Sequence, residues 1–286
     1  YLKSLQYFYF KIVKFVFFIY QIFMGYKDKI SAQKFYDCIS DNYEEQLKNG
    51  ILANTIRKHF QRKLLSNFRF GNKVLDIGCG TGIDAVFLAS NKIYVTATDI
   101  SPKMIEKARQ KIRDSEFCDF INISIKDSNV TENLTDETYD GVISNFDSIN
   151  HLDIPLFINN LNRLLITKGK VQLTALNKRC LWEFIYYMMK FRPLKAIEQL
   201  KSREKNLVSE INLFTPGKLL GYLRSNFRVI KITCFGFIIP PDGFKGLQKR
   251  FGKIFRKLEK ADMFIASFFP FRNFCDHYII EIEKIK

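Results

Sequence analysis

The sequence lacks any pair of cysteines with the spacing of a zinc site or a redox motif. Its six cysteines stand apart at positions 38, 79, 118, 180, 234 and 275, and no two of them form CxxC. Zinc and thioredoxin-type motifs place two cysteines within a few residues of each other, so we expect neither a metal site nor a redox pair. A chain of 286 residues buries a core without disulfides, and scattered thiols are typical of a reduced, cytoplasmic protein.

Long uncharged hydrophobic runs are also missing. The longest, residues 15–26, lies in an apolar N-terminal segment (residues 1–27) and is shorter than the roughly 18 residues that a membrane-spanning helix needs. Four interpretations of this segment stay open: a helix lying in a membrane interface, a helix packed on the domain with a basic edge exposed, a secretory signal, and a clipped signal-anchor. Against the secretory signal, no small-residue cleavage site is present near Gly25. No repeat or low-complexity linker divides residues 28–286, which we expect to form one domain.

Acidic residues are scarce in three parts of the chain. The net charge is +16, yet residues 28–177 hold 19 basic and 19 acidic residues. The surplus lies in residues 1–27 (four Lys, no acid), 178–205 (eight basic, three acidic) and 245–260 (seven basic, one acidic). These segments are either solvated helix faces or surfaces that contact an anionic partner, such as phospholipid headgroups, a phosphorylated acceptor or nucleic acid.

A glycine-rich turn joins a predicted strand to a predicted helix. Residues 73–77 are a short apolar run, and residues 83–89 have apolar residues at helical spacing. The intervening glycines allow positive φ and a close approach to a ligand, and the N–H groups of a helix start favour an anionic group. A dinucleotide fingerprint needs Gly or Ala where Ile83 stands. Asp76, two residues before the first glycine, would repel a pyrophosphate but suits a ligand that carries an amino group.

The string VLDIGCGTG at residues 74–82 resembles motif I of the class I S-adenosylmethionine-dependent methyltransferases. The resemblance implies S-adenosylmethionine as the cofactor. It also implies an α/β fold: a Rossmann-like, doubly wound, mostly parallel seven-stranded sheet with an antiparallel last strand and a helical insertion. Five residues of the string match positions that surround the cofactor in that family: Asp76, Gly78, Cys79, Gly80 and Gly82.

The next predicted strand supports the resemblance. Residues 93–98 form a β-branched run that ends in Asp99, about 20 residues after the glycines, where an acid accepts hydrogen bonds from ribose hydroxyls. Ser101 is a good helix N-cap and is followed by Pro102 at the first helical position. The string DISPKM at residues 99–104 again resembles the family, and this resemblance implies that Ile100 and Met104 flank the adenine.

Further strands alternate with helices, as a parallel doubly wound sheet requires. We predict strands at residues 120–125, 139–145 and 171–175, with a helix at 153–166 and a turn at 167–170 before the last of them. In the family, an acid after the third strand meets the adenine amino group, which Asp127, followed by Ser128, matches. The fourth strand ends at Asn145, beside the cofactor in the family pattern.

The loop after the fourth strand supplies the catalytic candidates, Asp147 and His151. Methyl transfer from a sulfonium depends mainly on holding the reacting groups in line, and a hydroxyl acceptor also requires a base. For His151 a helix-capping or packing role is an alternative. The [D/N]-P-P-[Y/F] string of enzymes that methylate amino groups of nucleic acids is absent, because Asn145 is followed by Phe146.

The C-terminal part contains two unusual helical segments. Residues 176–212 form an insertion that covers the acceptor site in this fold, and residues 181–189 are apolar on nearly all sides, so they are buried or meet lipid or a hydrophobic ligand, burial being the commoner case. Residues 244–262 predict a basic amphipathic helix, which lies either on an anionic membrane or on the sheet. A helix at 214–225 and strands at 228–237 and 277–282 complete the predicted fold, the last strand being antiparallel in this family.

These patterns predict a cytoplasmic methyltransferase for a small, amphiphilic or anionic acceptor, with peripheral membrane contact through residues 1–27 and 244–262. Two alternatives differ in class. The first is an RNA or protein methyltransferase that binds through the basic segments, although no recognised RNA-binding module is present and nucleic acid is the less favoured partner. The second is a protein that binds the cofactor without catalysis. The acceptor pocket decides among them, and the fold alone does not.

Overall fold

The computed structural model describes residues 31–112, 115–122, 134, 138–201 and 211–285. The apolar N-terminal segment lies outside these residues. No helix in the described part of the chain is long and apolar enough to cross a membrane.

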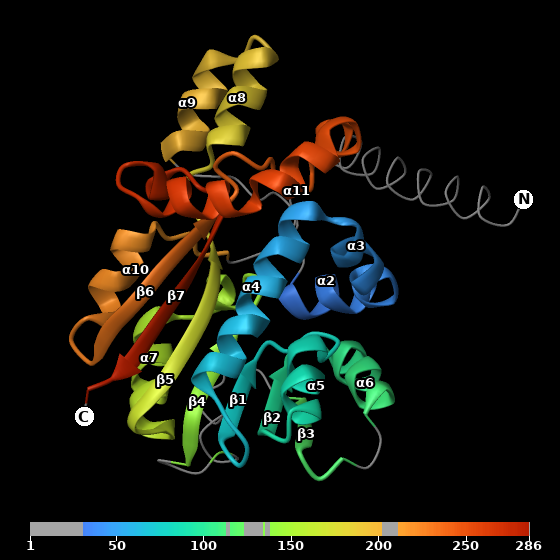
Figure 1. Ribbon diagram of the computed structural model, residues 1–286, viewed down its shortest axis with the longest axis vertical. Helices are drawn as coiled ribbons and strands as arrows, with labels where there is room; N and C mark the ends of the chain where they lie inside the picture. Colours follow the sequence, from blue (N-terminus) through green and yellow to red (C-terminus); the bar gives the residue numbers. More distant parts are fainter. Residues whose placement is uncertain (1–30, 113–114, 123–133, 135–137, 202–210, 286) are drawn as a thin grey trace, which may run out of the picture.

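One seven-stranded sheet forms the centre of the described structure, with strand order β3-β2-β1-β4-β5-β7-β6 (Figure 1). The strands are β1 (Lys73–Ile77), β2 (Tyr94–Asp99), β3 (Cys118–Asn122), β4 (Tyr139–Ser144), β5 (Leu165–Leu176), β6 (Phe227–Phe235) and β7 (His277–Lys284). Strands β1 to β5 pair in parallel, and β7 is antiparallel to both β5 and β6. The predicted sheet is confirmed, and its last strand lies between β5 and β6.

Helices cover both faces of this sheet (Figure 1). The helices in the described part of the chain are α2 (Ala32–Ile39), α3 (Tyr43–Asn49), α4 (Ile51–Asn67), α5 (Ile83–Ser90), α6 (Pro102–Lys111), α7 (Ile154–Leu164), α8 (Leu181–Met189), α9 (Pro193–Lys201), α10 (Pro216–Leu223) and α11 (Lys245–Ser267). The described residues also form the short 3₁₀ turns η1 (Ser40–Asn42), η3 (Ser148–His151) and η4 (Phe271–Asn273).

Alternate residues of the central strands enter two separate cores. In β1, Val74 packs with α4, α5 and α6, whereas Leu75 packs with α7 and α10. In β4, Ile143 and Val142 divide in the same way. Successive side chains of a strand point to opposite faces of the sheet. A strand that is buried on both faces therefore appears in the sequence as a continuous apolar run rather than an alternating one.

The predicted start of α6 is confirmed, and one predicted turn is wrong. The Ser101 side chain accepts a hydrogen bond from the Met104 N–H, and Pro102 is the first helical residue. Residues 167–170, predicted as a turn, belong to β5, which begins directly after α7. Lys168 takes a positive φ of 62° and the pairing of β5 with β4 shifts register nearby, so an irregularity within the strand replaces the turn.

Helices α8 and α9 form a hairpin that projects beyond the end of the sheet (Figure 1). Burial, the commoner of the cases expected for residues 181–189, does not hold, because none of the residues of α8 is buried. Two contacts hold the base of the hairpin. The Leu181 N–H donates to the Phe274 carbonyl at 2.9 Å, and the Trp182 indole donates to the Phe237 carbonyl at 3.1 Å. Beyond this base α8 packs along α9 and the Tyr186 ring lies against Phe244, while Tyr186, Met188 and Met189 stay exposed.

Helix α11 includes the predicted basic amphipathic segment and continues to Ser267. One face packs on the domain: Gly252 approaches Ile51 of α4 so closely that a Cβ would lie 3.0 Å from its side chain. On the same helix Asp262 is buried, and its carboxylate accepts four hydrogen bonds of 2.5–3.2 Å from the backbone N–H groups of residues 236–239. This carboxylate therefore anchors α11 to the turn that follows β6.

We predict that Asp262→Ala lowers the free energy of unfolding by about 3 kcal/mol or more, because four buried N–H groups lose a charged acceptor. Urea denaturation followed by circular dichroism measures the change. Glu259→Ala, one helical turn earlier on α11, is the matched control and is expected to change stability by less than about 0.5 kcal/mol. Equal effects of the two substitutions would contradict an anchoring role.

Candidate functional site

The turn between β1 and α5 is made of glycines with positive φ. Gly78, Gly80 and Gly82 have φ values of 69°, 55° and 74°, a region that side chains with a Cβ rarely adopt. Gly78 also has no room for a side chain, because a Cβ would overlap Ser148 of η3. At Gly82 a Cβ would lie 2.8 Å from the Cβ of Ala108 in α6. The first of these glycines thus lets the loop after β4 approach the turn, and the last lets α6 approach it.

Asp99 at the end of β2 holds the same turn. Its carboxylate accepts hydrogen bonds from the Gly80 N–H and the Ser101 N–H, each at 2.8 Å. Burial raises the pKa of Asp99, and these two backbone hydrogen bonds lower it in part. A carboxylate has about four lone-pair sites. Asp99 therefore keeps capacity to accept hydrogen bonds from hydroxyl groups of a ligand.

A cavity of about 660 Å³ opens beside Asp99. Three groups of residues line it: Gly78, Gly80 and Asp99 of the turn and β2, Ile100 and Met104 at the start of α6, and Phe146, Ser148, His151 and Leu152 after β4. Ile77, Thr98 and three residues of the N-terminal helices, Ala32, Tyr36 and Tyr43, complete the lining.

A smaller cavity of about 280 Å³ shares Tyr43, Gly78 and Phe146 with the larger one. Asp76 and Arg57 are among its charged lining residues. In the described residues no donor reaches the Asp76 carboxylate. Burial, reinforced by the carboxylates of Asp84 and Asp99, raises the pKa of Asp76 well above its usual range. A cationic group beside Asp76 would relieve this repulsion.

Three residues of the smaller cavity, Arg57, Asn145 and Phe146, form a network around Asp84. Its carboxylate accepts hydrogen bonds from the Asn145 amide at 2.8 Å and from Arg57 at 3.3 Å. The Arg57 guanidinium also lies over the Phe146 ring, 4.6 Å from its centroid. Asn145 is thus directed at α5, and the network fixes the positive charge of Arg57 at the cavity wall.

Helices α2 and α3 are tied to α6 across the larger cavity. The Ser101 hydroxyl donates to the Asp37 carboxylate at 2.5 Å. Two ion pairs add to this contact: Lys107 of α6 pairs with Asp41 of η1, which connects α2 to α3, at 2.8 Å, and Lys111 of α6 pairs with Glu44 of α3. The aromatic side chains of Tyr36 and Tyr43 are therefore held over the cavity by polar contacts to the helix that begins at Ser101.

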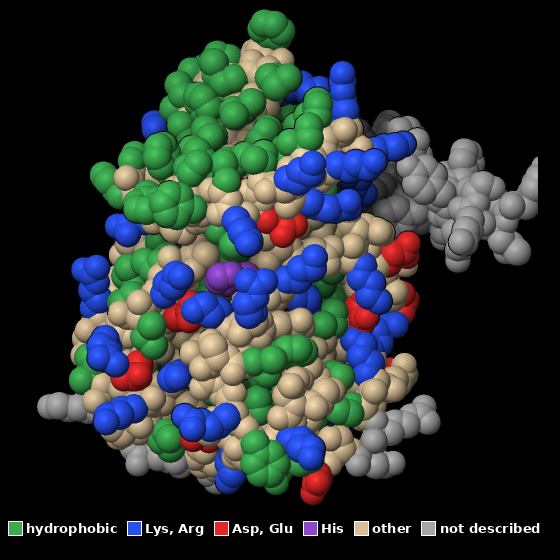
Figure 2. All heavy atoms as spheres, viewed as in Figure 1, with side chains coloured by type: hydrophobic (Ala, Val, Ile, Leu, Met, Phe, Trp, Pro, Cys, Tyr) green, Lys and Arg blue, Asp and Glu red, His purple; other side chains and the backbone are tan. Residues whose placement is uncertain are grey.

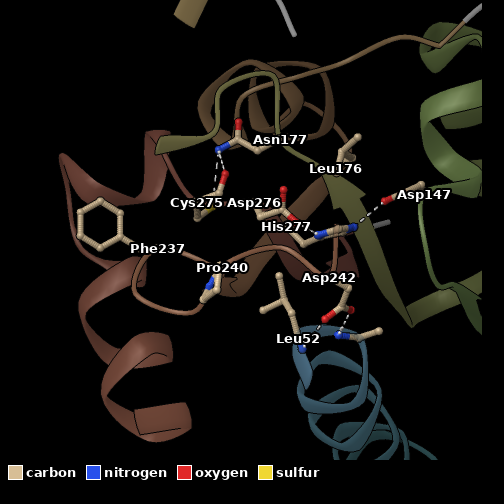
Figure 3. Close-up of polar contacts among 12 residues, drawn as sticks. Leu52, Asp147, Leu176, Asn177, Phe237, Pro240, Asp242, Cys275, Asp276 and His277 are labelled. Carbon is tan, nitrogen blue, oxygen red and sulfur yellow. Dashed lines mark hydrogen bonds and ion pairs between the residues drawn. The ribbon is translucent and has the colours of Figure 1, made fainter. Parts of the chain in front are cut away.

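The two catalytic candidates point to different places. His151 lines the larger cavity, and its Nε2 lies 3.3 Å from the Tyr36 hydroxyl. The Asp147 carboxylate lies 3.1 Å from Nε2 of His277, whose Nδ1 is 2.7 Å from Asp276 (Figure 3). Asp147 also has a positive φ of 68°. The structure thus joins Asp147 to the start of β7 rather than to the lining of the larger cavity.

The pKa of His277 follows from this arrangement. Burial opposes its protonation, but the carboxylates of Asp147 and Asp276 on its two sides raise its pKa to about 10. His277 is therefore an imidazolium near neutral pH, and both of its ring nitrogens donate to carboxylates. This charged chain connects the loop after β4 to the start of β7.

The structure brings most of the sequence-predicted residues to the two cavities. Gly78, Gly80, Asp99, Ile100, Met104 and His151 line the larger one, and Asp76, Cys79 and Asn145 line the smaller one together with Gly78. Gly82 and Asp147 are not among the lining residues. Asp127 and Ser128 lie outside the described residues. Sequence reasoning missed Tyr36, Tyr43, Arg57 and His277, which come from α2, α3, α4 and β7 and carry no local motif.

The cavities fit S-adenosylmethionine. If the cofactor lies across both cavities, Asp76 would accept from its amino group, Arg57 would face its carboxylate, and Asp99 would accept from its ribose hydroxyls. Ile100 and Met104 provide an apolar wall beside Asp99 for a flat base. The two cavities adjoin at Gly78, so a single extended ligand can occupy both.

Comparison with known proteins agrees with this fit. Residues 74–169 match the family model described as a methyltransferase domain. A demethylmenaquinone methyltransferase of Symbiobacterium thermophilum is 27% identical over 145 residues, which cover 49% of this chain and 56% of the relative. The match thus spans just over half of that relative's length.

Two solved structures share the fold. The Haloferax volcanii protein in complex with the Trm112 methyltransferase activator has a TM-score of 0.56 at 14% identity and covers 88% of this chain and 95% of its own. A geranyl diphosphate methyltransferase in complex with S-adenosylmethionine has a TM-score of 0.51 at 13% identity and covers 80% and 85%. Residues 74–169 therefore form a methyltransferase domain, and the chain has the fold of the class I S-adenosylmethionine-dependent methyltransferases. S-adenosylmethionine is its cofactor.

We predict that Asp99→Ala weakens S-adenosylmethionine binding by roughly 10–100-fold, because charge-assisted hydrogen bonds contribute about 1.5–3 kcal/mol each. Isothermal titration calorimetry measures the change in Kd. Asp119→Ala, which removes an exposed carboxylate from the neighbouring strand β3, is the matched control and should bind as the unaltered chain does. Unchanged affinity in Asp99→Ala would contradict its assignment to the cofactor site.

We also predict a pH dependence of stability that arises from His277. Its pKa rises from about 6.5 in the unfolded chain to about 10 in the folded protein, so the folded state binds the proton more tightly. This stabilisation is complete below about pH 6.5 and is lost as the pH rises through about 10. In His277→Gln the decline over this window should be smaller, as urea unfolding at a series of pH values would show. An unchanged decline would contradict the charged chain.

Proposed function

We propose that this protein transfers a methyl group from S-adenosylmethionine to a small acceptor that is amphiphilic or anionic. The observation that carries the proposal is the composition of the larger cavity. The cofactor-motif residues Gly78, Gly80 and Asp99 share the lining of one cavity with Tyr36 and His151. A ligand at the motif residues would therefore be adjacent to a polar pair that can act on a second molecule.

The walls of the cavity favour a small acceptor. Ala32, Tyr36 and Tyr43 close one side, and Phe146 and Leu152 add further apolar surface. An acceptor must fit beneath α2 and α3, which the Ser101–Asp37 hydrogen bond and the Lys107–Asp41 ion pair hold to α6. A mostly apolar site with a few directed polar groups is typical of small-molecule recognition.

The proposed chemistry needs alignment and one proton acceptor. The bound cofactor supplies an electrophilic methyl group on a sulfonium, and the protein's main task is to hold an acceptor atom in line with it. His151 is placed to take the proton of a hydroxyl acceptor, which would account for ~10²–10⁴-fold of the rate. Burial raises the pKa of Tyr36 well above its usual range, so its hydroxyl stays neutral and its oxygen can accept from Nε2–H of His151. This contact orients the ring and leaves Nδ1 as the nitrogen that takes the proton.

Asp147 has a positioning role in this proposal. Its contact with His277 fixes the residue immediately before η3, and η3 carries Ser148 and His151. Ser148 donates in turn to the Gly78 carbonyl at 3.2 Å. The loop after β4 is thus held at both the β7 side and the glycine turn, which keeps His151 at the cavity.

The compared proteins point to acceptors of the same character. Demethylmenaquinone and geranyl diphosphate, named in two of the matches, are both amphiphilic, and the second is anionic. Two further interpretations from the sequence remain proposals: binding of RNA or a protein through the basic segments, and peripheral membrane contact through residues 1–27 and 244–262. A protein that binds the cofactor without turning it over is the third alternative.

The test is methyl transfer from radiolabelled S-adenosylmethionine to separate acceptors: a short-chain demethylmenaquinol, geranyl diphosphate and total RNA. Transfer to a small amphiphile, with S-adenosylhomocysteine released in equal amount, is the expected result. Label entering RNA alone would favour the nucleic-acid alternative. Cofactor binding with no transfer to these acceptors would favour the non-catalytic one.

With a productive acceptor, His151→Ala is expected to lower kcat by ~10²–10⁴-fold because the proton acceptor is lost. The Kd for S-adenosylmethionine should change little. His59→Ala is the matched control, since His59 packs against Phe235 of β6 and is not among the lining residues of either cavity. A kcat in His151→Ala equal to that of the control would remove His151 from the mechanism.

A further inference from the structure

The tip of the α8–α9 hairpin presents bare apolar side chains. Met189, Phe191 and Leu194 are 76%, 94% and 77% exposed. Phe191 also adopts a positive φ of 55°, a conformation that is strained for a bulky residue and is usual for glycine. Folding stability alone does not account for a phenylalanine that is both strained and exposed, and such a residue points to a function at the surface.

The apolar surface continues from the hairpin to the end of α11. Phe264, Phe268 and Phe269 are all exposed, and the Phe264 and Phe268 rings lie 4.8 Å apart. Phe271 of η4 contacts the ring of Phe237 at 5.0 Å, and the Phe237 carbonyl accepts from Trp182 at the base of α8. Figure 2 shows one broad hydrophobic surface over this end of the molecule. We call it the apolar face; its residues are Tyr186, Met188, Met189, Phe191, Leu194, Ile197, Phe264, Phe268, Phe269 and Phe271.

Basic side chains border the apolar face. Helix α11 contains seven basic residues and two acidic ones, and one of the acids, Asp262, is buried by its bonds to the turn after β6. The hairpin adds Lys190, Arg192 and Lys195. Figure 2 shows Lys and Arg side chains gathered at the margin of the hydrophobic surface, with few acidic ones among them.

Two basic side chains at this end of the molecule, Lys190 of the hairpin and Arg272 of η4, lie beside exposed aromatic rings. The distance from the charged group to the ring centroid is 5.7 Å for Lys190 and Tyr186, and 6.0 Å for Arg272 and Phe269. Long basic side chains can cover apolar surface with their stems while their charged ends reach a polar layer. A surface on which aromatic and basic side chains lie next to each other is typical of contact with the headgroup region of a bilayer.

We propose that the apolar face docks onto an anionic phospholipid membrane. The apolar side chains would enter the boundary between headgroups and acyl chains, and the basic border would meet the phosphates, each such charge favouring binding by roughly five-fold. The charge pattern favours this occupant over a second protein, because protein interfaces are depleted of Lys. This face is distinct from the contact that the sequence patterns indicate for residues 1–27.

Docking would also orient the methyltransferase site. The hairpin follows the carboxyl end of β5, and the cofactor residues follow the carboxyl ends of β1 and β2, so face and cavity lie at the same end of the parallel sheet. Delivery of a lipophilic acceptor from the bilayer rests on the proposed function. Membrane binding itself does not, so vesicle binding and methyl transfer succeed or fail independently.

The test is flotation of the full chain with vesicles of phosphatidylcholine alone and of phosphatidylcholine mixed equally with phosphatidylglycerol. One variant replaces Met189, Phe191 and Leu194 by Ser, and a second replaces Lys253, Arg256 and Lys257 by Glu. We expect binding to the anionic vesicles, about ten-fold or more weaker in the first variant and about 100-fold or more weaker in the second. All six side chains are exposed, so the variants should bind S-adenosylmethionine normally.

Two control variants are matched to these changes. Phe70→Ser removes an aromatic side chain that is 72% exposed away from the face, and replacing Lys73, Lys218 and Arg224 by Glu makes the same change in charge elsewhere. Both should float as the unaltered chain does. No flotation of the unaltered chain with anionic vesicles, or equal flotation of all variants, would overturn the proposal. Self-association that the Met189, Phe191 and Leu194 changes abolish, without vesicle binding, would instead identify a protein interface.

Discussion

The carboxylate of Asp99 is the junction on which the rest of the site depends. It accepts from Gly80 and from Ser101 at 2.8 Å, so one side chain fixes both the glycine turn after β1 and the first turn of α6. The Ser101 hydroxyl then donates to Asp37 of α2, which carries the constraint to the helices over the cavity. Since Asp99 is buried, removal of its carboxyl group would leave two backbone donors without their acceptor in a place that water reaches poorly.

A second constraint holds the opposite side of the cavity. His277 lies between Asp147 and Asp276, and removal of the imidazolium would bring two carboxylates together without a cation. Breaking a buried charge network of this kind is strongly destabilising, because the remaining charge is uncompensated. The loop that carries His151 is therefore placed by electrostatics at β7 and by the close approach of Ser148 to Gly78.

Much of the fold was predictable because its signals are local. The apolar run of β1, the glycine turn and the Ser101 cap each occupy a few consecutive residues, and the backbone geometry follows from their chemistry. The partners of these elements were not predictable in this way. His151 meets Tyr36 and Asp147 meets His277 across more than a hundred residues of chain, and no local pattern marks either pair.

Apolar patterning also failed to distinguish burial from exposure. Residues 181–189 have the composition of a core helix, yet they form one arm of a projecting hairpin. An apolar composition indicates that burial of the helix surface would be favourable. It does not indicate whether the surface is buried by the same chain or by a membrane or another partner. The hairpin and the end of α11 contribute to one hydrophobic surface at this end of the molecule (Figure 2). Only the three-dimensional structure brings the strained Phe191 and the basic border to this surface.

The position of β7 has a consequence for biosynthesis. Strand β6 pairs only with β7 among the described strands, and β7 fills the place between β5 and β6. A ribosome produces β6 before β7, so the nascent chain exposes two unpaired strand edges until β7 emerges. Exposed edges of this kind invite pairing with other chains. Strands β1 to β5, which include the cofactor-binding side of the sheet, can assemble before β7 is synthesised. Strand β6 can join the sheet only after β7 is present, and β7 also brings His277 to the loop after β4.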